Sequence, residues 1–155
     1  MNPCPCGNYG SSDKVCNCTP AQIAKYKARI SGPLLDRIDI QVEVDSVKYS
    51  ELTSTEQAES SAVVRERVNR TRLIQKERFK DDGILTNSDM GERQLKKYCQ
   101  LSLECEALLK KAYDSLHLSP RARSRIIKVA RTIADMNLSK DIKIEHLLEA
   151  ISYRH

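Results

Sequence analysis

Apolar and polar residues alternate strictly along one short segment of this chain. The apolar positions are Ile38, Ile40, Val42 and Val44, and the polar ones are Asp39, Gln41, Glu43 and Asp45. This period of two predicts a half-buried strand. Gly32-Pro33 predicts a turn just before the strand, so Arg37 is expected at the strand entrance. An exposed ion pair of Arg37 with Asp36 or Asp39 is the simplest alternative for this arginine.

Further along the chain the apolar spacing becomes helical. A mostly polar helix is predicted over about 60–80, ending at Asp81-Asp82-Gly83, and a short helix from Asn87 or Ser88 to Tyr98. The next helix starts its apolar stripe at Leu101 and continues it through Cys105, Leu108, Leu109, Ala112 and Leu116. A fourth helix starts at Ser119-Pro120, and the last has its stripe on Ile144, Leu147, Leu148 and Ile151. The pattern predicts a bundle of about four or five helices after a boundary near residue 50.

Four of the six cysteines lie close together near the N-terminus, as Cys4-Pro5-Cys6 and Cys16-Asn17-Cys18. In a cytosolic protein, clustered thiols indicate a metal site before they indicate disulfides. Four thiolates suit tetrahedral zinc, and such a closed site is structural. Redox-active or simply reduced thiols are the alternatives. Cys99 and Cys105 occupy apolar helical positions and are predicted to lie in the core.

Composition and charge set the broad class. The chain has 155 residues, 40% of them hydrophobic and 30% charged, with a net charge of +5. These values are typical of a globular protein without a membrane span, and a cytoplasmic location is the default expectation. The cations cluster: seven lie between Val63 and Lys80 against two acids, and five lie between Pro120 and Arg131 against none. Both segments predict basic helices that face DNA or nucleotide phosphates, or that are simply solvated.

Several motifs of the chain occur together in one known family. They are NPCPCG, CNC, YKARISGPLLDRIDIQVEV, SPRARSRIIKVARTIADM and IKIEHLLEAISYR. With these motifs the chain resembles the C-terminal part of the magnesium-chelatase-like AAA+ ATPases, specifically the ComM family. Residues of about 46–115 match in pattern alone. The resemblance implies that residues 1–50 are the end of an α/β ATPase core, with the cysteine loop and one strand, and that residues 51–155 are the helical lid.

The resemblance also implies roles for individual residues. Arg37 would be an arginine finger that enters a neighbouring subunit's nucleotide site, and Asn2 would be the sensor 1 residue that orients the attacking water. Arg121, at a helix start, would be the sensor 2 arginine that contacts the nucleotide. The sequence holds no glycine-rich phosphate loop and no apolar strand ending in magnesium-binding acids. We therefore expect the chain to be a fragment that is inactive alone, with ATP and magnesium bound by the full-length protein.

Three functions remain open at this point. The resemblance favours a homo-oligomeric ring, expected to be a hexamer, that works on DNA during recombination or natural transformation without contacting a membrane. A magnesium chelatase ATPase-type subunit shares the architecture. A zinc-containing nucleic-acid-binding module that acts alone is the non-enzymatic alternative, and it predicts salt-sensitive DNA binding by the isolated chain.

Overall fold

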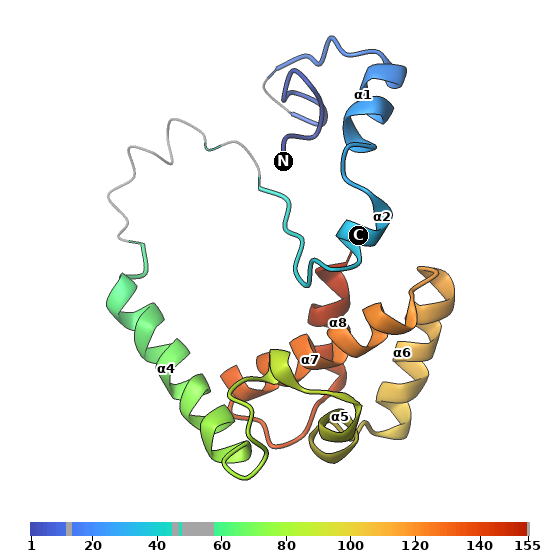
Figure 1. Cartoon of the computed structure of the whole chain (residues 1–155). Coiled ribbons are helices and arrows are strands. Elements are labelled where there is room, and N and C mark those ends of the chain that lie inside the picture. Colours follow the sequence, from blue (N-terminus) through green and yellow to red (C-terminus); the bar gives the residue numbers. More distant parts are fainter. Residues whose placement is uncertain (12–13, 45–46, 48–57, 155) are drawn as a thin grey trace. The chain divides into compact units, whose positions relative to one another are not determined.

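The chain divides into two units in a computed structural model that describes residues 1–11, 14–44, 47 and 58–154. The first unit comprises Met1–Ile38 and Val42–Glu56, and the second comprises Asp39–Gln41 and Gln57–His155. Figure 1 shows the helices of both units. The domain boundary expected between residues 50 and 51 lies outside the described residues. No helix among the described residues is long and apolar enough to cross a membrane.

Two short helices form the regular part of the first unit, α1 (Pro20–Lys27) and α2 (Gly32–Leu35). Thr19 caps α1: its Oγ1 accepts the Gln22 N–H at 3.3 Å, and the Gln22 side chain accepts the Thr19 N–H at 2.9 Å. Ser31 caps α2 by accepting the Leu34 N–H at 3.4 Å. Each helix has proline in its first turn, where a missing N–H costs no hydrogen bond. The predicted turn at Gly32-Pro33 is therefore a single helical turn.

The predicted strand at residues 38–45 is wrong for the residues that the structure describes, because residues 38–44 form no strand. The positions expected to be buried are exposed, by 51% at Ile40 and 86% at Val44. A strand needs a partner backbone, and no described segment forms a ladder with this one. Within the second unit, which includes Asp39–Gln41, the Gln41 N–H donates to the C=O of Tyr153, the cap residue of α8, at 3.0 Å. Asp45 lies outside the described residues.

The second unit is a helical bundle, as predicted. Its helices are α4 (Ser61–Arg78), the 3₁₀ turn η1 (Asn87–Asp89), α5 (Glu92–Tyr98), α6 (Leu103–Ser115), α7 (Pro120–Met136) and α8 (Ile144–Ser152). Ser119 starts α7 as expected, with its Oγ accepting the Ala122 N–H at 3.1 Å. The single helix predicted from Asn87 or Ser88 to Tyr98 is wrong. Met90 and Gly91 have extended backbones that separate η1 from α5.

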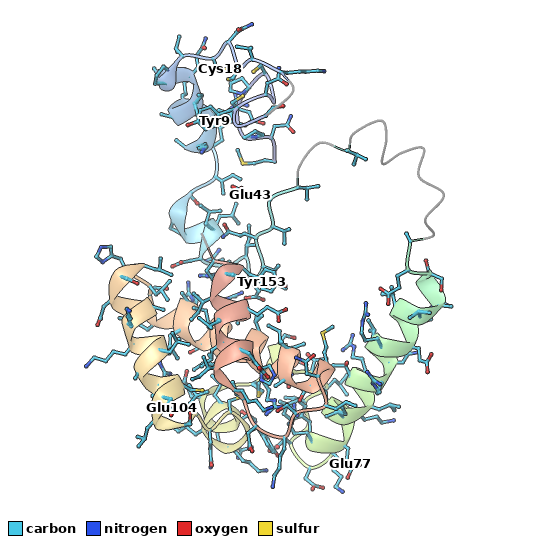
Figure 2. The ribbon with its side chains drawn as sticks, turned by 180° about the vertical axis from the view of Figure 1, so that it is seen from behind. Tyr9, Cys18, Glu43, Glu77, Glu104 and Tyr153 are labelled. Carbon is cyan, nitrogen blue, oxygen red and sulfur yellow. The ribbon has the colours of Figure 1, made fainter. Side chains whose placement is uncertain are left out.

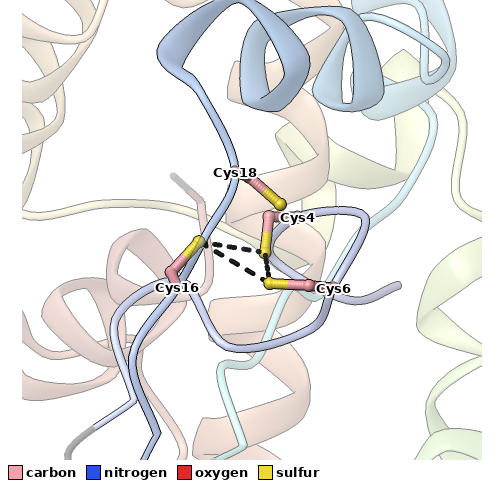
Figure 3. A group of neighbouring side chains, drawn as sticks. All are labelled: Cys4, Cys6, Cys16 and Cys18. Carbon is pink, nitrogen blue, oxygen red and sulfur yellow. Dashed lines mark hydrogen bonds between the residues drawn. The ribbon is translucent and has the colours of Figure 1, made fainter.

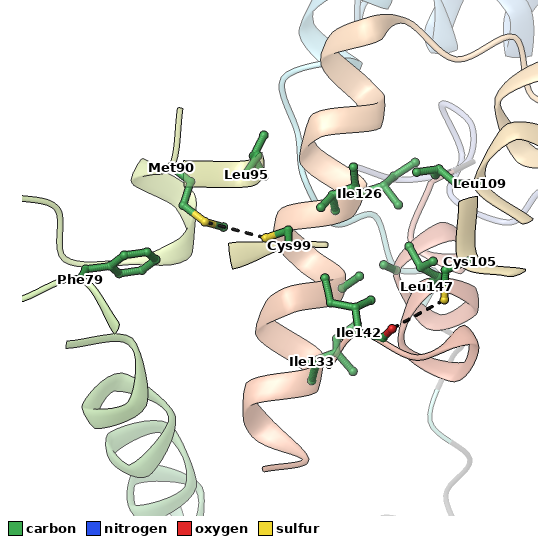
Figure 4. Packing of buried hydrophobic residues seen from close by; sticks show 14 residues of the cluster. Phe79, Met90, Leu95, Cys99, Cys105, Leu109, Ile126, Ile133, Ile142 and Leu147 are labelled. Atoms are coloured by element: carbon green, nitrogen blue, oxygen red, sulfur yellow. Dashed lines mark hydrogen bonds between the residues drawn. The ribbon is translucent and has the colours of Figure 1, made fainter. Parts of the chain in front are cut away.

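Helix α7 lies at the centre of this bundle and supplies much of its core. Ile126, Ile127, Ala130, Ile133 and Ala134 are buried along α7. They pack with Leu109 of α6 and Leu147 of α8 (Figure 4). Cys99 and Cys105 are buried, as predicted. The Cys99 Sγ lies 3.9 Å from the Met90 Sδ, and the Cys105 thiol donates to the Ile142 C=O at 3.6 Å. Burial raises the pKa of Cys99 to about 11, so it is an inert core thiol.

The predicted stripe on α8 is partly wrong. Leu147 is fully buried, but Leu148 is 52% exposed and Ile144 is 38% exposed. His146 is buried in their place, and its Nδ1 accepts the Lys143 N–H at 3.0 Å. This bond satisfies an amide at the helix start, and the buried face of α8 consists of His146, Leu147 and Ala150.

Candidate metal centre and exposed arginines

The four N-terminal cysteines gather at one point of the first unit (Figure 3). The Cys4 Sγ lies 3.4 Å from the Cys6 Sγ and 3.7 Å from the Cys16 Sγ, and the Cys6 and Cys16 sulfurs are 3.7 Å apart. The Cys18 sulfur is the fourth member of the group, and all four sulfurs lie within 4.8 Å of one another. Four ligands about 2.3 Å from one tetrahedral zinc ion would have sulfurs about 3.8 Å apart. The four cysteines therefore form a group that could hold a metal ion such as zinc.

Glycine turns bring the two cysteine pairs together. The Gly7 N–H donates to the Cys4 C=O at 3.0 Å, and the Ser11 N–H donates to the Asn8 C=O at 3.1 Å. Gly7 and Gly10 have φ angles of +82° and +83° in these turns. Glycine adopts this left-handed region without the strain that a Cβ causes. The sequence Cys-Gly-Asn-Tyr-Gly thus folds the chain back between the two C-x-C pairs.

The four thiols do not ionise independently. Burial opposes ionisation of Cys4, but hydrogen bonds from the Cys6 thiol and the Tyr9 backbone outweigh it and lower its pKa to about 6. A hydrogen bond with the Cys6 backbone favours ionised Cys18, but burial and the neighbouring thiols raise its pKa to about 12. One thiolate forms readily because the other thiols donate to it, and each further charge is repelled. A divalent cation would remove this repulsion and bind all four thiolates.

The cysteine loop leads directly into α1. Thr19, the residue that caps α1, follows Cys18 in the sequence. The Lys27 Nζ, at the other end of α1, lies 5.4 Å from the centre of the Tyr9 ring in the loop, a cation–π distance. No residue of α1 is buried. The cluster and this contact therefore hold a helix that has no apolar core of its own.

The structure leaves the predicted catalytic and nucleotide-binding residues on exposed positions. Asn2 and Arg37 belong to the first unit and Arg121 to the second, and all three are exposed. Arg37 follows Asp36, the C-terminal cap residue of α2, and its N–H donates to the Leu34 C=O at 3.0 Å. Arg121 lies in the first turn of α7. The roles of these three residues stay predictions.

Two arginines that the sequence analysis counted among the basic helices turn inward, Arg131 fully buried and Arg78 half-buried. Arg131 and Asp135 are both buried on α7, and the Arg131 Nε donates to the Asp135 Oδ1 at 3.1 Å. The Arg78 Nη1 of α4 donates to the Asp135 Oδ2 at 2.7 Å, and the Asn87 Nδ2 donates to the same oxygen at 2.9 Å. The i,i+4 spacing of Arg131 and Asp135 is a signal that could have been found in the sequence. The partners Arg78 and Asn87, far away in sequence, could not.

Comparison with known proteins identifies the family of the chain. Residues 58–154 match the family model described as magnesium chelatase, subunit ChlI C-terminal, and residues 1–52 match the model described as magnesium chelatase, subunit ChlI. The chain belongs to the magnesium chelatase ChlI-like family. The resemblance inferred from the cysteine, arginine and helix motifs is thereby confirmed.

Individual relatives of this ChlI-like chain match almost all of it. It is 40% identical to the Competence protein ComM of Haemophilus influenzae over 156 residues, which is 99% of this chain and 29% of the relative. It is 40% identical over 155 residues to the uncharacterized protein YifB of Escherichia coli, with the same coverage. A relative from Mycobacterium tuberculosis, the uncharacterized protein Rv2897c, is 31% identical over 153 residues, or 99% of this chain and 30% of that relative. The chain thus spans under a third of the length of these relatives.

Proposed function

We propose that this chain is the C-terminal portion of a ring-forming AAA+ ATPase that acts on DNA. The observation that carries the proposal is the match to the Competence protein ComM over 99% of the chain. ATP and magnesium would be bound by the full-length protein, because this sequence contains no phosphate-binding loop. Its own contribution would be the residues that sense the nucleotide and trigger hydrolysis. The expected assembly is a homo-oligomeric ring, such as a hexamer.

Arg37 would act as the arginine finger of this ATPase. Phosphoryl transfer spreads charge over the γ-phosphate oxygens, and a planar guanidinium placed there stabilises that charge. Two features support this role. Arg37 is exposed, and it follows a capped, proline-started helical turn that gives the backbone before it a defined direction. Asn2 would orient the attacking water, as sensor 1.

Arg121 would contact the bound nucleotide as sensor 2. It lies at the start of α7, behind a serine cap and a proline. Helix α7 supplies the centre of the bundle core, so a shift of α7 caused by nucleotide binding at Arg121 would be transmitted to the helices packed against it. Binding at this one exposed side chain would therefore report nucleotide state to the rest of the lid.

The four-cysteine cluster would hold one structural zinc ion. Four protein ligands leave no open coordination position, which argues against a role in catalysis. Zinc would fix the loop that precedes α1 and thereby the segment that leads to Arg37. Cys4, Cys6, Cys16 and Cys18 would each supply one sulfur.

A motor for metal insertion into a tetrapyrrole is the second candidate. The descriptions of both matching family models favour it, because they name magnesium chelatase. Stimulation of ATP hydrolysis by DNA would support the DNA-acting alternative. Stimulation by a chelatase partner subunit, with no response to DNA, would support the second candidate.

Replacing the matched region of Haemophilus influenzae ComM by this chain allows the proposal to be tested. Arg37→Ala should lower ATP hydrolysis by about 10³-fold or more, the range found for arginine fingers. Arg29→Ala, an exposed arginine in the same unit, is the matched control and should leave hydrolysis unchanged. Mixing Arg37→Ala subunits with subunits that lack the phosphate-loop lysine should restore part of the activity, because the finger acts in a neighbour. Wild-type hydrolysis by Arg37→Ala would refute the assignment.

A further inference from the structure

Helix α4 has one buried face and one fully exposed face. Thr71 and Gln75 are buried, and Arg78 reaches the buried Asp135. Four residues on an exposed side of the helix, about 120° around its axis from the buried face, have the spacing i, i+4, i+7 and i+11, which places them in one row along the helix axis. This row, the basic stripe, consists of Arg65, Asn69, Arg72 and Lys76, all exposed.

The cations of the basic stripe are not neutralised by the described acids. Among the described residues, the ion pairs of the acids near α4 go elsewhere: Glu59 pairs with Arg67 at 2.9 Å, and Glu77 pairs with Lys80 at 2.6 Å. No described acid forms a salt bridge with Arg65, Arg72 or Lys76. Opposite charges on a helix pair at a spacing of three or four residues, and no acid stands at that spacing from Arg65, Arg72 or Lys76. Among the described residues, the three cations of the stripe therefore have no salt-bridged partner.

The C-terminal half of α4 is anchored to the bundle, and the stripe is accessible. The buried side of α4 is fixed to α7 and η1 by Arg78, which contacts Asp135 and donates to the Asn87 Oδ1 at 3.0 Å. The Gln75 Oε1 also accepts the Asn87 N–H at 3.3 Å. Figure 1 shows the first turns of α4 extending beyond the other helices of its unit, and Figure 2 shows its side chains, with Glu77 labelled near the C-terminal end. An anchored helix can hold three cations at fixed spacing without further loss of backbone entropy.

We propose that the basic stripe of α4 binds the sugar-phosphate backbone of DNA. From Arg65 to Lys76 the stripe extends about 16 Å, at about 1.5 Å per residue. Successive phosphates of one strand rise about 3.4 Å along a duplex, so the stripe covers about five of them. Arginine and lysine bind phosphate oxygens directly, and the Asn69 amide can donate to a fourth group. This contact would be independent of sequence, as backbone contacts are.

The inference rests on the proposed action on DNA, but its test needs no ATP hydrolysis. The 155-residue chain is titrated against a fluorescein-labelled 20-nucleotide strand and against the duplex of the same sequence, with anisotropy read between 50 and 200 mM salt. The variant is the triple substitution Arg65→Gln, Arg72→Gln and Lys76→Gln. Glutamine keeps helix propensity and length, so fold and Tm should not change.

A matched control removes the same charge elsewhere. Lys96→Gln, Lys110→Gln and Lys111→Gln alter three exposed cations on α5 and α6. The slope of log affinity against log salt should fall by about 2.7 for duplex and about 2.1 for single strand in the stripe variant, since each phosphate contact contributes about 0.9 or 0.7. When salt rises from 50 to 200 mM, three duplex contacts of the wild-type chain account for about a 40-fold loss of its affinity. The control triple should keep the wild-type slope.

Either of two results would overturn the inference. One is a wild-type salt slope in the stripe variant, and the other is an equal fall in both triples, which would mean that net charge alone decides binding. A slope change on one of the two probes and not on the other would identify the form of DNA that the stripe contacts. If the stripe variant keeps the wild-type slope while Arg37→Ala loses ATP hydrolysis, the proposed function stands and DNA is contacted by another surface.

Discussion

Asp135 is the carboxylate on which the charged interior of the bundle depends. It is 1% exposed, and it accepts hydrogen bonds from Arg78, Arg131 and Asn87. Burial lowers the pKa of Arg131, and the negative charge of Asp135 opposes this effect. Asp135→Ala would leave the Arg131 guanidinium, itself 2% exposed, without its counter-ion. Removing one partner of a buried ion pair costs about 3–5 kcal/mol.

Urea unfolding followed by helical circular dichroism measures this cost, and we expect Asp135→Ala to lower the free energy of unfolding by about 3–5 kcal/mol. Asp141→Ala is the matched control, because Asp141 is exposed and close in sequence, and its effect should stay within about 0.5 kcal/mol. Adding Arg131→Met to Asp135→Ala should recover part of the loss, since an apolar residue needs no counter-ion. A loss below about 1 kcal/mol for Asp135→Ala would refute the reasoning.

Three further predictions concern other parts of the chain. Burial lowers the pKa of His146 below its usual value, so neutral His146 stabilises the fold above about pH 6.5 and this contribution is lost as the pH falls. The drop in Tm from pH 7.5 to 5 should therefore be smaller in His146→Gln than in the wild type, and an equal drop would contradict this prediction. Purified chain should contain one zinc ion by mass spectrometry of metals, and Cys16→Ser should lower that content while the core variant Cys99→Ala keeps it; equal content in both variants would exclude the cluster as the site. Ser119→Ala should cost about 1 kcal/mol of unfolding free energy, since it removes the α7 cap, and Ser119→Gly should cost a few tenths; equal stability of Ser119→Ala and wild type would argue against the cap.

The sequence by itself determined the features that depend on neighbours within a few residues. Helix starts are of this kind, because a serine cap and a following proline act on amides of the next turn, as at Ser119-Pro120. The buried Cys99 and Cys105 could be read from helical spacing alone. The cysteine quartet could also be predicted, since its two pairs are joined by a short loop with glycines suited to tight turns.

Tertiary structure alone decided the features that need a distant partner. The alternating segment at residues 38–44 satisfies the pattern of a strand, but a strand forms when a second backbone takes up its hydrogen bonds, and no described segment does so. Nothing near Arg78 in the sequence indicates that its side chain turns inward, because its partner Asp135 lies 57 residues away. Likewise, the burial of His146 in place of Leu148 on α8 follows from the fit of this helix against α7. Local patterns specify which helices form, whereas burial of charge and pairing of strands depend on what the fold places opposite them.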